Sequence, residues 1–422
     1  MSPRLRLLLL VLALVASASS ACSSRERTGA VASAKASPEL TKPKPRSAAL
    51  GPGNAERGQA LIQKYQCNRC HEGTGLAPAE RNAHCVNCHQ QILAGTFPAA
   101  KDKLERWKAH VGYVRLVPSL VGARERLSRD FIARFLLEPF DVRPLLAPSM
   151  PRLALSAEDA RDIATALTVG QESAAPSPAR VPADPKRGRA LLETRGCGNC
   201  HRFSRVPALP QTPDAGSAAQ NDALLLAPDL AHTRERWAEA SLVRWLRDPR
   251  ALKADTLMPP TGFDEAEARD VARYLLDSPL AAAPTVPTSK RLPPLERRVT
   301  FAEVDEKVLR VTCRHCHSNP DASLGDGGPG NTGGLGFSGR AIDFSSYRGT
   351  LSGYRDDRHE RHSLFEPLAD GTPRLVAALL ARQDEQAGRP RADVRGMPLG
   401  LPALSSEQIQ LVDTWIQQGR PE

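Results

Sequence analysis

Eight cysteines of this chain fall in four Cys-x-x-Cys-His motifs, and each motif brings two thiols and an imidazole together on one short stretch. The motifs occupy 67–71 (CNRCH), 85–89 (CVNCH), 197–201 (CGNCH) and 313–317 (CRHCH), which leaves Cys22 outside them. A disulfide framework gives no reason for a histidine after every pair. A zinc site would take four ligands, typically from two such pairs, and would not need that histidine. Neither of these common cysteine chemistries accounts for the pattern.

The spacing suits covalent attachment of a haem. A haem held through its two vinyl groups needs two thiols about one helical turn apart, and a histidine that meets the iron from the same side. The motif supplies all three groups on one turn. Four copies therefore predict four haem c groups.

With these motifs the chain resembles the multihaem c-type cytochromes, here a tetrahaem one. The resemblance implies that the motif cysteines form the thioethers and that each motif histidine is a proximal iron ligand. The implied attachment residues are Cys67, Cys70, Cys85, Cys88, Cys197, Cys200, Cys313 and Cys316. The implied proximal ligands are His71, His89, His201 and His317.

The sixth iron ligands are expected among the methionines. Beyond the initiator, the chain has Met150, Met258 and Met397, each followed by proline and each lying between a motif and a later amphipathic helix. A thioether opposite histidine leaves no open coordination position and raises the reduction potential. Core packing is the alternative for any single methionine, but the shared context of all three predicts iron ligation.

Two parts of the chain repeat the elements that must position these groups. The stretches "AERGQALIQKYQ" and "PKRGRALLETRG" precede the first and third motifs, with an Arg-Gly pair at the same distance from each. A Pro-x-Leu loop, a second helix, a Met-Pro loop and a closing helix follow in both. Each closing helix begins at a Ser or Asp cap with an acidic residue three positions later. Its apolar stripe, with Ile163 in the first and Val271 in the second, predicts core packing.

The third part departs from this order. Its first helix, "FAEVDEKVLRVTCRHCH", lacks the Arg-Gly pair, and a glycine-rich stretch at 325–339 follows its motif. That stretch lacks the Lys-Ser/Thr ending of a phosphate-binding loop, so we expect a flexible loop at the haem edge. The end of the chain resembles the planctomycete-type cytochrome c modules. Val412, Trp415 and Ile416 form its apolar face, and Ser405–Gln408 is a capping box.

These elements predict a mainly α fold of three cytochrome c-like helical modules in tandem, joined by Pro/Ala-rich linkers. The expected divisions are a signal peptide (1–21), a lipoprotein tether (22–54), a dihaem module (55–170), a linker (171–184), a monohaem module (185–278), a second linker (279–300) and a second monohaem module (301–422).

The second motif complicates the first module. In the second repeat, the motif histidine His201 lies 27 residues before the proline of the Pro-x-Leu loop. In the first repeat, the corresponding proline follows His89 by 29 residues but His71 by 47. Spacing alone would therefore pair the second motif with Met150. The Arg-Gly helix, however, precedes the first motif. We expect residues 75–112 to be an enlarged loop with its own haem, and Met150 to serve the first haem.

The sixth ligand of the second haem has two candidates. His110 lies in the same insertion, where a surface or propionate-bonding role is the alternative, and His84 adjoins an attachment cysteine. If neither serves, that haem is five-coordinate and open to a small ligand. Of the other histidines, we expect His315 to be a spacer, and His359 and His362 to lie on a solvated face.

The N-terminus predicts export. Arg4 and Arg6 precede an apolar run and then small residues, which is typical of a signal peptide and too short for a comfortable membrane span. "SSAC", ending at Cys22, resembles the lipobox of bacterial lipoproteins, although Ser19 stands where leucine is usual. The alternative is secretion with Cys22 as an incidental thiol. We expect the periplasm or outer cell envelope of a bacterium, with a lipid anchor at Cys22.

The formal net charge of +10 does not indicate a nucleic-acid partner, because no recognition motif accompanies it. Four haems would add roughly eight propionate carboxylates and bring the loaded protein nearer to neutrality. The planar guanidinium of arginine suits such carboxylates. The arginine excess is thus expected to bind propionates.

Together these patterns predict electron transfer between a respiratory donor and acceptor, with irons that cycle between Fe(II) and Fe(III). The expected partners are redox proteins, and we expect a carrier without catalytic residues. One alternative is a haem peroxidase or reductase with one open haem, although the sequence offers no distal acid/base set. Another is a cytochrome subunit of a larger respiratory complex.

Overall fold

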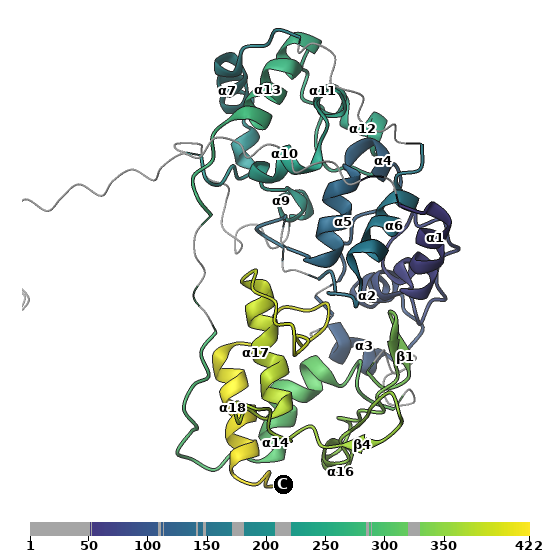
Figure 1. Cartoon of the computed structure of the whole chain (residues 1–422), viewed down its shortest axis with the longest axis vertical. Helices are drawn as coiled ribbons and strands as arrows, with labels where there is room; N and C mark the ends of the chain where they lie inside the picture. Colours follow the sequence, from purple (N-terminus) through teal and green to yellow (C-terminus); the bar gives the residue numbers. More distant parts are fainter. Residues whose placement is uncertain are drawn as a thin grey trace, which may run out of the picture. The chain divides into compact units, whose positions relative to one another are not determined.

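A computed structural model describes residues 51, 53–108, 111–112, 114–140, 142–146, 149–170, 181–206, 221–283, 287, 289–319 and 330–422 (Figure 1). The predicted signal peptide, Cys22, nearly all of the tether, most of the first linker and His110 lie outside these residues. The described chain is mainly helical, as predicted, and its strands form two short antiparallel hairpins. Three large clusters of buried apolar side chains lie in residues 53–170, 181–283 and 289–422, which we call the first, second and third segments.

The first segment is built on α1 (Ala55–Lys64), α5 (Arg129–Leu137) and α6 (Ala157–Leu167). Helix α6 packs against both of the others (Figure 1). Ile62 on α1 and Ile163 on α6 are almost completely buried at this contact, as the predicted apolar stripe requires. Two short elements, η2 (Cys67–Arg69) and α4 (Ala123–Arg126), complete the segment around the first motif.

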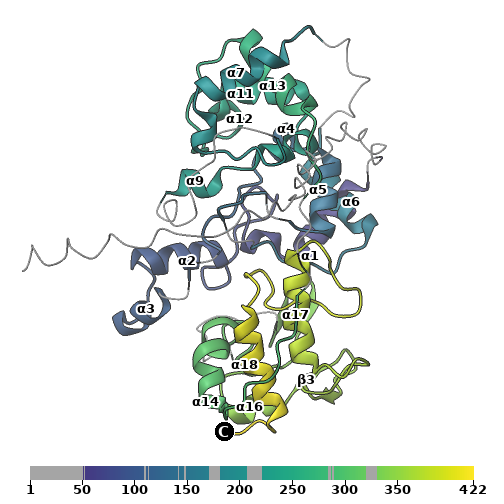
Figure 2. The ribbon, with the colours of Figure 1, turned by 90° about the vertical axis from the view of Figure 1, so that its left-hand side faces the viewer.

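The insertion between these elements has a small core of its own. It contains α2 (Cys85–Ala94), which begins at the second motif, and α3 (Lys101–Lys108). The two helices follow one another along the chain and contact each other (Figure 2). Ile92, Phe97 and Leu104 are buried between them, and Trp107 packs against this group. The enlarged loop expected at 75–112 therefore contains a helical hairpin, α2–α3, which is held by apolar contacts.

The second segment repeats the plan of the first. Its main helices are α7 (Pro185–Thr194), α11 (Glu239–Arg247) and α13 (Glu265–Asp277), and α13 packs against both of the others. The short elements are η3 (Cys197–Asn199), α9 (Asp222–Leu226), η4 (Leu230–His232), α10 (Thr233–Arg236) and α12 (Pro249–Leu252). Val271 and Leu275 on α13 are buried in its core, as the sequence predicted.

The repeated Arg-Gly pair has a physical explanation in the packing of first helix on closing helix. A Cβ at Gly58 would collide with the carbonyl of Asp162, and one at Gly188 would collide with that of Asp270. The arginine before each glycine pairs with the side chain of that same aspartate. Arg57 pairs with Asp162, and Arg187 Nη1 lies 3.0 Å from Asp270 Oδ2. The glycine permits close approach of the two helices, and the arginine neutralises the carboxylate that this approach buries.

The closing helices begin where the sequence predicted. Capping boxes are present at Ser156 with Asp159, at Asp264 with Glu267, and at Ser405 with Gln408. In each box the cap side chain accepts from the backbone of the third residue, whose side chain accepts in return from the cap backbone.

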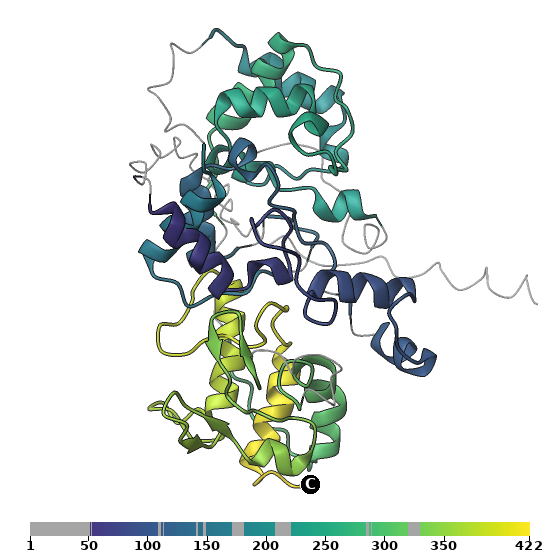
Figure 3. The same cartoon turned by 90° about the vertical axis from the view of Figure 1, so that its right-hand side faces the viewer.

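The third segment differs in its secondary structure. Its first helix starts as α14 (Phe301–Val304) and continues as a π-helix, η5 (Asp305–Cys313), up to the fourth motif. Helix α18 (Ser406–Gln417) packs against both, and α17 (Arg374–Gln386) packs on α18 (Figure 3). The remaining elements are β1 (Gly333–Gly334), β2 (Phe337–Ser338), α16 (Tyr347–Leu351), β3 (Tyr354–Arg355) and β4 (Arg361–His362). Val412, Trp415 and Ile416 are buried, as predicted.

Two expectations about loops were wrong in their described parts. Residues 330–339 of the glycine-rich stretch include the β1–β2 hairpin, and the backbone amide of Leu335 there donates to Gln66 of the first segment at 3.2 Å. The second linker is packed at its end: Arg291 binds Asp413 through two hydrogen bonds of 2.6 and 2.8 Å, and Val299 is fully buried. Composition predicted a flexible loop for the first stretch and an unpacked, semi-extended linker for the second, but both make specific contacts with distant residues.

Candidate functional site

The first motif and Met150 line one cavity. Cys67, Cys70, His71 and Met150 all reach its wall, although the methionine lies 79 positions after His71 in the sequence. The cavity has a volume of about 250 Å³. Its lining is mostly apolar and includes Ile62, Phe131, Phe135, Leu136, Phe140 and Ile163. An imidazole and a thioether thus share an apolar chamber with both thiols of the motif.

The backbone of the Pro-x-Leu loop orients His71. Its Nδ1 lies 2.9 Å from the carbonyl oxygen of Pro118, and the amide of Leu120 donates to the carbonyl of Glu72 at 2.9 Å. Burial lowers the pKa of His71, and the Pro118 carbonyl acts in the opposite direction. Since Nδ1 donates to the carbonyl, the lone pair is on Nε2, as a metal ligand requires. The loop therefore belongs to the first motif, despite the longer spacing.

The second segment repeats this arrangement. His201 Nδ1 lies 2.9 Å from the Pro228 carbonyl, and the amide of Leu230 donates to the carbonyl of Arg202 at 2.8 Å. Burial lowers the pKa of His201 as well, so its imidazole is neutral at pH 7. In both segments a proline carbonyl binds Nδ1 of the motif histidine, so the two imidazoles are oriented in the same way.

Met258 in the same segment is held by an indole. Trp245 Nε1 donates to its Sδ at 3.1 Å, and both Trp245 and Cys197 pack against the core of the second segment. This contact brings the predicted thioether to the core that also holds the third motif. The sulfur retains a second lone pair for a metal.

In the third segment, His317 is enclosed on two sides. Its ring centre lies 5.6 Å from that of Phe344, and a Cβ at Gly330 would collide with its imidazole. Burial lowers the pKa of His317 to about 4. Met397 and Cys313 both pack against the core of this segment. Each predicted methionine thus lies with the core that holds its own motif.

The second motif lies at the start of α2. The preceding residue, His84, is almost fully buried and caps this helix, because its Nδ1 accepts from the backbone amide of Asn87 at 3.2 Å. His89 lies one turn further along, and its ring centre is 6.3 Å from that of His315 in the fourth motif. Cys85 is hydrogen-bonded to Cys70, so the first and second motifs are in contact.

The wall of the first cavity has four arginines and one carboxylate, namely Arg126, Arg143, Arg236, Arg382 and Glu385. The carboxylate of Glu385 lies 3.3 Å from Arg382. Burial, followed by the charges of Arg143 and Arg126, lowers the pKa of Arg236 to about 9. All three residues reach the cavity wall, and among the described residues Arg126 Nε is buried without a hydrogen-bond partner. Guanidinium groups that repel one another in an apolar chamber favour an anionic occupant.

One of these arginines comes from the second segment, and a pair of reciprocal contacts holds it there. Arg244 lies 3.5 Å from Glu125, and Arg134 lies 3.9 Å from Glu235. The two pairs join equivalent positions of the repeats. The backbone amide of Ser128 also donates to the carbonyl of Arg236 at 2.8 Å. The first and second segments therefore contact each other through equivalent helices, and one of these contacts brings Arg236 to the first cavity.

These residues fit a haem. A neutral imidazole and a thioether on one apolar cavity can ligate iron, two thiols are present for thioethers, and the guanidiniums on the wall can receive propionates. The group itself would supply one-electron Fe(II)/Fe(III) cycling. Sequence reasoning missed the contribution of Arg236, although its repeat equivalent, Arg126, has the same place after a Pro-x-Leu loop.

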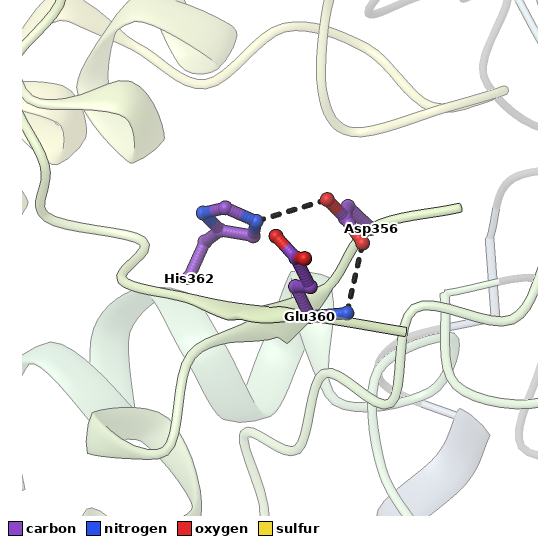
Figure 4. Close-up of side chains that lie close together, drawn as sticks. All are labelled: Asp356, Glu360 and His362. Atoms are coloured by element: carbon purple, nitrogen blue, oxygen red, sulfur yellow. Dashed lines mark hydrogen bonds and ion pairs between the residues drawn. The ribbon is translucent and has the colours of Figure 1, made fainter. Parts of the chain in front are cut away.

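A separate cluster lies on the β3–β4 hairpin. Asp356, Glu360 and His362 place their potential ligand atoms within 4.8 Å of one another (Figure 4). Asp356 already accepts from the backbone amides of Arg358 and Glu360 and lies 3.0 Å from His362 Nε2. These contacts explain the cluster as a hairpin brace. His359 is exposed, as predicted, whereas His362 is only half-exposed.

The sequence matches no known family model, no curated protein and no solved structure. None of the helices in the described part of the chain is long and apolar enough to span a membrane.

Proposed function

We propose that the chain is an exported tetrahaem c-type cytochrome that transfers electrons between redox proteins. Four Cys-x-x-Cys-His motifs are the basis of the proposal. The observation that carries it is the first cavity, where His71 and Met150 line one apolar chamber with both motif cysteines. Three cytochrome c-like modules in tandem, corresponding to the three segments, are part of the proposal.

The residues of the chain have distinct parts in this function. The cysteine pairs hold the cofactors covalently, and the motif histidines offer Nε2 while backbone carbonyls fix Nδ1 of His71 and His201. Met150, Met258 and Met397 would each offer a thioether as a second iron ligand, and the bound haems would supply one-electron transfer. Arg126, Arg143 and Arg236 receive propionates in the first cavity. Apolar walls keep water from the metal.

The localisation and partners complete the proposal. The N-terminal pattern supports export to the periplasm or outer envelope of a bacterium, with lipid attachment at Cys22. A membrane oxidoreductase on one side and a small cytochrome or terminal reductase on the other would serve as donor and acceptor.

The test is to produce the full chain in a host that attaches haem c, and to measure covalent haem by mass and by pyridine haemochrome absorption. We expect four haems per chain and stepwise, reversible redox titration. Fewer than four would overturn the proposal. A high-spin haem with turnover of peroxide or nitrite would instead support an enzyme.

A further inference from the structure

His89 and His315 face each other across two segments. Their ring centres are 6.3 Å apart, and the ring planes are inclined by 58°. His89 follows the second attachment pair on α2, whereas His315 lies between the two cysteines of the fourth motif. The fold thus brings together two imidazoles that are 226 positions apart in sequence.

We infer that His315 is the sixth ligand of the second haem, opposite His89. This inference rests on the proposed function. Two imidazoles that bind one ion from opposite sides have ring centres about 6 Å apart, because each nitrogen lies about 2 Å from the metal and roughly 1 Å from its own ring centre. The observed separation agrees with that value. An inclination of 58° is compatible, because each ring can turn about its own metal–nitrogen bond.

The local alternative, His84, is engaged elsewhere. Its Nδ1 accepts a hydrogen bond from the amide of Asn87, so in the neutral ring the proton lies on Nε2 and no lone pair is left for iron. Ligation through Nδ1 would break the hydrogen bond with which His84 caps α2. His315 is exposed on the third segment, so a group can lie between it and His89.

This ligation explains why one segment has two motifs. The second haem would be attached next to the first, since Cys85 contacts Cys70. It would also take its ligand from the attachment loop of the fourth haem, because His315 stands between Cys313 and Cys316. The insertion at 75–112 therefore carries a relay haem between the first and third segments.

The experiment uses the full, haem-loaded chain and its variants His315→Ala and His315→Met. Low-temperature EPR and near-infrared magnetic circular dichroism separate bis-His haems from His/Met haems. In the wild type we expect one bis-His and three His/Met haems. His315→Ala should retain four haems and lose the bis-His signal, and His315→Met should convert it to a fourth His/Met signal. His359→Ala is the matched control and should leave the spectrum unchanged. His110→Ala tests the competing ligand expected from the sequence, and the bis-His signal should persist in it.

Several outcomes would overturn the inference. If the wild-type spectrum shows no bis-His haem, the inference is wrong and no variant is needed to show it. An unchanged bis-His signal in His315→Ala, or its loss in His110→Ala alone, also contradicts it. These results leave the proposed function intact if four haems are attached, whereas a haem count below four is a failure of the proposed function itself.

Discussion

The thiols of Cys70 and Cys85 are hydrogen-bonded to each other, although they belong to different motifs. This bond and burial raise the pKa of Cys70 well above the ordinary value of a thiol. The last cysteine of the first motif thus meets the first cysteine of the second. On the proposed function, the haems attached to Cys70 and Cys85 would lie edge to edge, and an electron would pass between them over a short distance.

The first prediction follows from this contact. In a chain produced without haem attachment, mild oxidation should link Cys70 to Cys85, because their sulfur atoms are already within hydrogen-bond distance. The raised pKa of Cys70 keeps its thiolate scarce at pH 7, so the link should form faster at pH 9. Peptide mapping without reductant measures both. Cys85→Ser should abolish the linked peptide, and a predominant Cys67–Cys70 link would contradict the prediction.

The second prediction concerns Arg236. On the proposed function, replacing it with glutamine removes a positive charge beside the first haem and stabilises Fe(III) there. We expect the midpoint potential of one haem to fall by about 60 mV, a tenfold change in a one-electron equilibrium. Potentiometric titration of the loaded protein measures this. The control is Arg250→Gln, an exposed residue of the same segment that does not line the cavity. An equal fall in both variants would count against a specific role for Arg236.

The third prediction tests the helix contact at Gly188. Alanine there should destabilise the second segment, because its Cβ would collide with the Asp270 carbonyl. We expect a loss of roughly 1–3 kcal/mol, even though alanine favours a helix over glycine by about 1 kcal/mol. Urea unfolding measures the change. Gly112→Ala is the control, since no atom lies within 4 Å of a Cβ at that position. Equal stability of the two variants would refute the packing argument.

The fourth prediction is a pH dependence at Glu303. Hydrogen bonds from Arg297 and Lys307 lower the pKa of Glu303 to about 2. The folded pKa is thus below the unfolded one, so the stabilisation is present above about pH 4.5 and is lost as pH falls towards 2. Glu303→Gln should lower the free energy of unfolding at pH 7 by roughly 1 kcal/mol, because the pair is partly exposed.

The measurement for Glu303 is urea unfolding at pH 7 and pH 3. The difference between wild type and variant should shrink at pH 3. Glu306→Gln is the control, because Glu306 is an exposed neighbour on the same helix. A difference that is as large at pH 3 as at pH 7 would exclude the ion pair as its cause.

Local sequence was sufficient where a local rule governs the structure. Capping boxes at Ser156, Asp264 and Ser405 predicted the starts of the closing helices, because the bonds of a box join residues three apart. The Arg-Gly repeat predicted the same first helix twice. Composition was a poor guide at 330–339 and 290–299, because contacts with distant residues hold those stretches.

The sequence by itself determined which groups can hold cofactors, since attachment depends on cysteines and a histidine within five consecutive residues. It also determined the mainly helical fold, through period and caps. Only the tertiary structure decided which other distant groups lie together: Arg236 lines the cavity of the first motif, and His315 faces His89. The physical reason is that such meetings depend on how packed helices bring distant positions together. A spacer within one motif can therefore face the histidine of another.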